Sequence, residues 1–214
     1  MVQLEKRNKL NKFLQGAGIL ILSILFCLPA NALTASEAFQ KGKNAISSAS
    51  SISASFTMKV GGKAISGKIL SQGNKFAITS NATSSWYNGS DLYTYNPSKG
   101  ETTIFRPSAS ELAEVNPLMY LKSASNFNVT ATKTKKTGLE TVVLIPKSSG
   151  SGIKSVTIDL DSKTFLPRYM KIIPSSGSAI DLTISNIKLN GAILDSSFSY
   201  PKSSYPKARI LDMR

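Results

Sequence analysis

Residues 52–60 read Ile-Ser-Ala-Ser-Phe-Thr-Met-Lys-Val, and this stretch decides the fold. Apolar side chains alternate with serine, threonine or lysine from the first position to the last. A period of two predicts a β-strand with one face buried and the other in water. The sequence therefore indicates a sheet protein, and the rest of the chain can be compared with this strand.

The same kind of pattern recurs along most of the chain, at intervals of about ten residues. Turn residues separate the patterns, with Asn88-Gly89 and Asn190-Gly191 as the clearest tight turns. Further strands are predicted near 63–71, 74–80, 83–88, 91–96, 101–106, 126–134, 139–146, 153–160, 166–173 and 179–189. Residues 208–213 are a candidate for one last short strand.

Three segments carry helix signals instead. Residues 34–51 begin with a capping box from Thr34 to Glu37 and then repeat small apolar residues at helical spacing, which predicts an amphipathic helix able to lie close to a sheet. A second capping box runs from Ser108 to Glu111. Asn116-Pro117 begins another short helix, whose body at 118–121 is unusually apolar.

The first 32 residues have the layout of a secretory signal. Four basic residues precede an apolar run from Gly16 to Leu28, which is short for a membrane span. Ala30-Asn31-Ala32 then predicts cleavage after Ala32; the alternative is an uncleaved anchor. Lipidation of Cys27 is rejected because Phe26 stands where a small residue is needed. We expect a signal peptide at 1–32, one domain at 33–214, and a periplasmic location.

Composition excludes several kinds of chemistry. The chain has no histidine, and its one cysteine lies in the predicted signal. Thiol nucleophiles, imidazole acid–base pairs and histidine-based metal sites are therefore excluded from the mature chain. Carboxylates are sparse, and there is no Gly-x-Ser-x-Gly elbow or phosphate-binding glycine loop. We expect no enzyme activity, no cofactor and no metal.

The positive charge does not indicate a nucleic-acid partner. Four of the 26 basic and one of the 12 acidic residues lie in the first 32, so the remaining chain carries a net charge of +11. Its lysines are scattered through alternating strands, whereas a nucleic-acid site gathers them on one face. Weak attraction to anionic lipid, or simple solubility, accounts for the charge equally well.

The sequence resembles that of a known family, the family of LolA, the periplasmic carrier of outer-membrane lipoproteins. The similarity covers nearly all of the mature chain and depends on the order of several short pieces. They are Ser53-Ala54-Ser55-Phe56-Thr57, Gly67, Asn74-Lys75-Phe76, Trp86-Tyr87-Asn88-Gly89, Leu92 to Pro97, Asn116-Pro117-Leu118, Leu144-Ile145-Pro146-Lys147, Phe198-Ser199-Tyr200-Pro201 and Leu211-Asp212-Met213-Arg214.

The resemblance implies a mainly β (α+β) fold: a half-open antiparallel β-barrel of about eleven strands, with an N-terminal helix and short lid helices around an apolar cavity. Positions similar to the family's cavity wall, together with strand parity and the apolar lid, predict a set of lipid-binding residues. The alternative for each of them is simple core packing. The set is Phe56, Met58, Phe76, Ile78, Leu118, Met119, Leu121, Val142, Leu144, Val156, Ile158, Leu182 and Ile184.

One position departs from the family pattern. The family has an arginine that holds the lid shut, and this chain has Gln72 there. A glutamine can still hydrogen-bond to lid carbonyls, but it carries no charge. Gln72 is therefore the predicted lid-gating residue, and the family's coupling to an inner-membrane transporter is in question.

The function implied by the resemblance is a monomeric carrier of acylated lipoproteins from the inner to the outer membrane. Its partners would be an inner-membrane lipoprotein-releasing transporter and an outer-membrane acceptor, with no nucleic acid. Two alternatives remain from the residues themselves. One is an exported β-rich protein that binds another lipid or acts as an envelope sensor. The other is a glycan-binding or structural module with a filled core.

Overall fold

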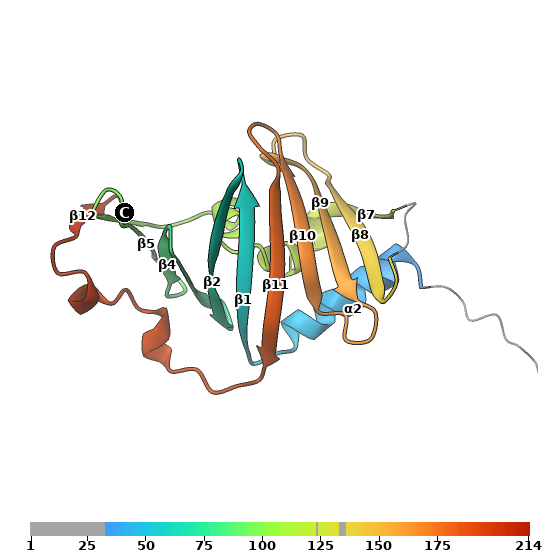
Figure 1. The fold of residues 1–214 in the computed structure, drawn as a ribbon, viewed down its shortest axis with the longest axis horizontal. Coiled ribbons are helices and arrows are strands. Elements are labelled where there is room, and N and C mark those ends of the chain that lie inside the picture. The colour runs from blue at the N-terminus through green and yellow to red at the C-terminus, as the bar shows by residue number, and fades with distance from the viewer. Residues whose placement is uncertain (1–32, 123, 133–135) are drawn as a thin grey trace, which may run out of the picture. The chain divides into compact units, whose positions relative to one another are not determined.

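In residues 33–122, 124–132 and 136–214, which the computed structural model describes, twelve strands form one sheet (Figure 1). The predicted signal peptide and its cleavage site lie outside these residues and stay predictions. Eleven predicted strands are confirmed, with boundaries that differ by a few residues at most. The strands are β1 Ser51–Val60, β2 Lys63–Gln72, β3 Lys75–Ser80, β4 Ser84–Tyr87, β5 Leu92–Asn96, β6 Glu101–Phe105, β7 Phe127–Ala131, β8 Leu139–Pro146, β9 Ile153–Asp161, β10 Pro167–Pro174, β11 Ile180–Leu189 and β12 Arg209–Asp212.

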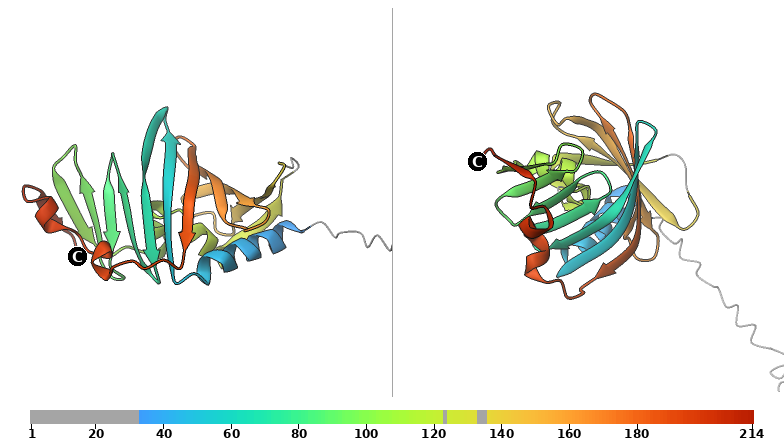
Figure 2. Two further views of the ribbon diagram at one scale, coloured as in Figure 1. Left: turned by 60° about the horizontal axis from the view of Figure 1, so that its bottom comes forward. Right: turned by 60° about the vertical axis from the view of Figure 1, so that its left-hand side comes forward.

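The strand order is β12-β6-β5-β4-β3-β2-β1-β11-β10-β9-β8-β7. The first strand pairs with the eleventh, so the sheet has two arms that meet at β1 and β11. The sheet is bent but not closed, which confirms the half-open antiparallel architecture (Figure 2). One pair is an exception: β12 runs parallel to β6 at one edge. Parallel pairing needs a long connection, and residues 190–208 supply it.

Three α-helices accompany the sheet in the described residues: α2 Ala35–Ser47, α3 Ala109–Val115 and α4 Met119–Lys122. The predicted capping boxes at Thr34 and Ser108 are both formed. α2 packs against β7, β8 and α4. It approaches so closely that a Cβ on Gly42 would lie 3.0 Å from a methyl carbon of Leu160. In the described part of the chain, no helix is long and apolar enough to cross a membrane.

The main core lies on the inner face of the sheet, where α2 and α4 cover β1 and β8–β11. Alternate residues of the strands point into it, as the period of two predicts. Its fully buried members include Ile46 of α2, Leu121 of α4 and Leu144, Ile158 and Met170 of the sheet. This dense packing supports one arm of the sheet.

A second, smaller core lies on the opposite face of the other arm. Ala77, Trp86 and Phe198 are buried there. The Trp86 ring meets the edge of Tyr200, with ring centroids 5.6 Å apart. Tyr200 in turn stacks on Tyr93 at 5.7 Å. These aromatic contacts hold the segment between β11 and β12 against the outer face of β3–β6.

Ion pairs hold the last strand in place. Arg214 Nη1 donates to Asp91 Oδ2 at 2.7 Å, and Arg214 Nε donates to Asp212 Oδ1 at 2.8 Å. The Arg214 guanidinium lowers the pKa of Asp212 to about 2 and also lowers the pKa of Asp91. Arg209 of β12 pairs with Glu101 of β6. The C-terminal strand is thus attached by charge and by backbone pairing, with few buried apolar groups.

We expect β12 to detach before the rest of the sheet when the solution is acidified. A carboxyl group with a lowered folded pKa contributes stability above its ordinary pKa, 3.8 for Asp212, and this contribution is lost as the pH falls towards about 2. Backbone NMR signals of Ile210 and Leu211 should change over this interval before those of β1. Signals of β12 that stay constant down to pH 2 would contradict this. Asp212→Asn should remove much of the pH dependence.

Candidate functional site

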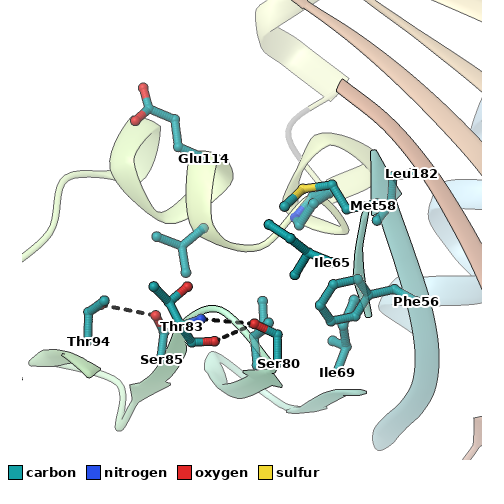
Figure 3. Close-up of a pocket in the computed structure, with 13 residues that line it drawn as sticks. Phe56, Met58, Ile65, Ile69, Ser80, Thr83, Ser85, Thr94, Glu114 and Leu182 are labelled. Carbon is teal, nitrogen blue, oxygen red and sulfur yellow. Dashed lines mark hydrogen bonds between the residues drawn. The ribbon is translucent and has the colours of Figure 1, made fainter. Parts of the chain in front are cut away.

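A hollow of about 270 Å³ lies on the inner face of the sheet, beneath α3 (Figure 3). β1, β2, β3, β4, β5 and β11 form its wall, and the segment from α3 to α4 forms its roof. Thirteen residues line it: Phe56, Met58, Ile65, Ile69, Ile78, Ser80, Thr83, Ser85, Thr94, Glu114, Val115, Pro117 and Leu182.

Strand register explains why these side chains meet. Met58 is the register partner of Leu182 on one side and of Ile65 on the other. Residues in register on neighbouring strands point to the same face, so the three form one apolar row. A second row joins Ile69 to Ile78. The alternation in four separate strands therefore produces a continuous apolar wall.

The far end of the hollow is polar. Ile78 is in register with Ser85, and Ser85 with Thr94. The Ser85 and Thr94 hydroxyl oxygens are 3.0 Å apart and hydrogen-bond to each other. Ser80 accepts from the Thr83 amide at 3.0 Å within the β3–β4 turn. Because these hydroxyls have partners, this end tolerates an apolar ligand and can also offer acceptor oxygens to a polar group.

A glycine makes room for the aromatic part of the wall. Gly67 of β2 is in register with Phe56 of β1. A Cβ at Gly67 would lie 2.8 Å from two Phe56 ring atoms and 2.1 Å from the Thr79 carbonyl oxygen. The Phe56 ring therefore occupies the space that any other residue at position 67 would fill.

The roof helix α3 is held loosely. None of its residues is buried. A second hollow, of about 230 Å³, lies on its other side. Glu114 borders both hollows, so α3 forms the partition between them. Displacement of α3 would join the two hollows, and it would break few apolar contacts.

The neighbouring helix α4 is anchored instead. Leu121 is fully buried, and Leu118 and Tyr120 are nearly so. The Tyr120 ring meets the edge of Phe127 in β7 at 6.1 Å. The predicted lid at 118–121 is therefore part of the main core, and the loosely held part of the roof is α3.

The structure brings four of the thirteen predicted lipid-binding residues together around the hollow: Phe56, Met58, Ile78 and Leu182. Most of the others are buried within the main core, where they support the wall from behind: Leu118, Leu121, Val142, Leu144, Val156, Ile158 and Ile184. Phe76 is buried at the other end of β3 against Tyr87, and Met119 is partly buried. Lipid binding by any of these residues remains a proposal.

The sequence predictions missed several residues of the wall and roof. Ile65 and Ile69 alternate around Gly67, so parity on β2 is the signal that would have placed them beside Phe56. Ser85, Thr94 and Glu114 carry no comparable signal, because polar residues on strands and helices mostly face solvent.

The position of Gln72 gives no support to its predicted gating role, which stays a prediction. Gln72 is exposed at the end of β2. By alternation it shares the outer face with Leu70, which packs on the aromatic core opposite the hollow. The roof contacts the β2–β3 turn through α4, where Lys122 Nζ donates to the Gly73 carbonyl oxygen at 3.3 Å. Burial lowers the pKa of Lys122 below its ordinary value.

We expect Lys122→Met to speed ligand release by a few fold. The variant loses one charge-assisted hydrogen bond, worth roughly 1 kcal/mol, while the apolar anchors of α4 remain. Gln72→Ala is the matched control, because Gln72 is next to Gly73 at the end of β2. It should leave the rate of ligand release unchanged. Stopped-flow release of a fluorescent fatty acid measures both. Equal rates for Lys122→Met and the unmodified protein would show that this contact does not hold the roof.

The fold and the site define the class of this protein: it is a β-sheet protein whose open, bent sheet has an apolar hollow on its inner face. The family model described as outer membrane lipoprotein carrier protein LolA matches residues 47–201. The chain belongs to this family, which confirms the resemblance seen in the sequence. No curated protein sequence matches the chain.

The solved structures that this chain is similar to are distant in sequence. An uncharacterized conserved protein from Thermus thermophilus is 10% identical, with a TM-score of 0.56 over 83% of this chain and 98% of that one. A LolA superfamily protein from Nitrosomonas europaea is 13% identical, with a TM-score of 0.43 over 79% and 99%. A chain of the Pseudomonas aeruginosa MucA/MucB complex is 13% identical, with a TM-score of 0.42 over 78% and 60%.

Proposed function

We propose that this protein is a carrier that binds an acyl chain of a lipoprotein in the hollow beneath α3. The observation that carries the proposal is the apolar wall of the hollow, formed by four strands in register under a helix without buried residues. Concave apolar sites with a few polar groups are the usual binding sites for small apolar ligands. The polar end and Glu114 leave room for the more polar part of an amphiphile.

The cellular setting of the proposal follows the family. Acylated lipoproteins would be the cargo, taken from an inner-membrane transporter and passed to an outer-membrane acceptor across the periplasm. The protein would act as a monomer. It would bind and release its cargo and catalyse no reaction.

The size of the hollow favours a second candidate function, transport of a single-chain amphiphile. Sites for drug-sized ligands usually have about 300–1,000 Å³, and this hollow has about 270 Å³. It accommodates one chain or part of one while α3 is in place. A cargo with several chains would need α3 to move, so that the hollow of about 230 Å³ on its other side becomes part of the site.

Competition binding tests the proposal and separates the two candidates. A fluorescent fatty acid should bind the purified protein, and unlabelled fatty acid should displace it. A synthetic triacylated lipopeptide should displace it with equal or higher affinity if the cargo is a lipoprotein. Displacement by the fatty acid alone would favour the single-chain amphiphile. Absence of fatty-acid binding would contradict both.

A further inference from the structure

One end of the sheet carries both the hollow and a group of exposed lysines. Neighbouring strands alternate in direction from β7 to β6, so the β1–β2, β3–β4, β8–β9 and β10–β11 connections all lie at the same end (Figure 1). The hollow lies towards this end: Met58 and Ile65 are close to the β1–β2 turn, Thr83 is in the β3–β4 turn, and Leu182 is near the start of β11.

Six exposed lysines of the described residues lie at the same strand ends. One is Lys99 in the β5–β6 turn, and we call the other five the basic rim. All five are exposed. Two belong to the β1–β2 hairpin, two flank the β8–β9 loop, and one lies near the end of β10. They are Lys59, Lys63, Lys147, Lys154 and Lys171.

The rim lysines have no ion-pair partner among the described residues. Asp181 lies in register between Lys59 and Lys171, but its carboxylate accepts a hydrogen bond from the Tyr169 hydroxyl. Glu114 of α3 is the carboxylate that borders the hollow. The end therefore has a surplus of positive charge around the site.

Several ion pairs lie at the opposite strand ends. Lys75 pairs with Asp195 there, and Arg168 with Asp161. Arg106 and Arg214 share Asp91, beside the β4–β5 turn. Lys163 and Lys188 at this end are exposed and have no ion pair among the described residues, so the feature that distinguishes the rim is its position beside the hollow.

We propose that the basic rim attaches the protein to an anionic lipid bilayer, with the hollow turned towards the membrane. The inference rests on the proposed function, because a bilayer is the source or destination of an acyl chain. The residue type favours a bilayer over an acidic protein: protein interfaces are depleted in lysine and enriched in arginine and aromatic residues. The rim has lysines only, and every arginine of the described residues is in an ion pair.

The loops of the rim indicate attachment by charge without insertion. The β1–β2 turn is Gly61-Gly62, and residues 148–152 and 175–178 are serine and glycine. None of these side chains can enter the hydrocarbon region. Lys63 shares a strand face with Ile65 of the hollow, so a headgroup bound there lies beside the apolar wall.

Vesicle binding tests the inference. The protein should bind vesicles of phosphatidylcholine with phosphatidylglycerol and should not bind vesicles of phosphatidylcholine alone. Each lysine near an anionic surface contributes roughly fivefold to binding, so the triple variant Lys59→Gln, Lys63→Gln, Lys171→Gln should bind about 100-fold more weakly. Added salt should weaken binding by the unmodified protein.

A matched triple variant removes the same charge from elsewhere: Lys163→Gln, Lys188→Gln, Lys202→Gln, all exposed and without ion pairs among the described residues. It should bind almost as well as the unmodified protein. Equal losses in the two variants would mean that net charge alone drives binding, and would overturn the role of the rim.

Fatty-acid binding in solution, measured on the same proteins, separates this inference from the proposed function. The rim variant should keep it, because none of its three lysines lines the hollow. Fatty-acid binding without any preference for anionic vesicles would overturn the proposed attachment to a bilayer, and would leave an acidic protein as the partner of the rim. Anionic vesicle binding without fatty-acid binding would refute the carrier function and leave the rim as a membrane-attachment site.

Discussion

Replacing Ile65 with tryptophan is expected to weaken fatty-acid binding at least about tenfold, or roughly 1.4 kcal/mol. Ile65 is partly exposed and lies in the apolar row with Met58 and Leu182. An indole ring at this place fills a hollow of about 270 Å³ that the ligand would otherwise occupy. The folded state should lose little stability, because the larger side chain enters open space and does not crowd a packed core.

Ile145→Trp provides the matched control. Ile145 is an exposed isoleucine of β8, at 39% exposure, and it does not line the hollow. The same substitution there should leave binding unchanged. Titration with the fluorescent fatty acid gives the affinities, and urea unfolding gives the stabilities. Normal binding by Ile65→Trp would place the ligand elsewhere, with the second hollow behind α3 as the next site to probe.

Gly67→Ala is expected to destabilise the fold by about 2–3 kcal/mol, as overpacking does in a well-packed region. Its Cβ would lie 2.1 Å from the Thr79 carbonyl oxygen, so β2 and β3 would have to move apart. Movement of backbone is more costly than rotation of a flexible side chain. The Phe56 ring would also be displaced into the hollow, so binding should weaken together with stability.

Gly191→Ala is the control for the glycine change itself. A Cβ at Gly191 would meet no atom within 4 Å. Its effect on the free energy of unfolding should be small, and urea unfolding of the two variants measures the difference. Equal stability of the two variants would show that the β2–β3 pairing adjusts easily at this position.

Local pattern was sufficient to predict most of the fold. Alternation in residues 52–60 gave the correct buried face of β1, and the capping residues Thr34 and Ser108 begin helices as predicted. These features depend on residues near one another in sequence, where alternation and end-capping act directly on the backbone. The parallel pairing of β12 with β6 could not be predicted, because it joins strands about a hundred residues apart.

The candidate site was predicted less completely than the fold. Strand parity assigned Val142 and Leu144 to the inner face, and the family resemblance assigned Val156 and Ile158; the structure places all four there. Parity cannot distinguish a residue that lines a hollow from one that packs under a helix. The position of α2 and α4 over β8–β11 makes these residues core, whereas the inner face of β2 and β3 lies beside the hollow.

The sequence by itself determined which residues form strands, which face of each strand is apolar, and which family the chain belongs to. The tertiary structure decided where the hollow lies, that α3 is the loosely held part of its roof, and that the five lysines of the rim meet at the end of the sheet that bears the hollow. The physical reason is the range of the interactions. Strand faces follow from neighbouring residues, whereas cover by helices and the pairing of charges depend on segments that meet only after folding.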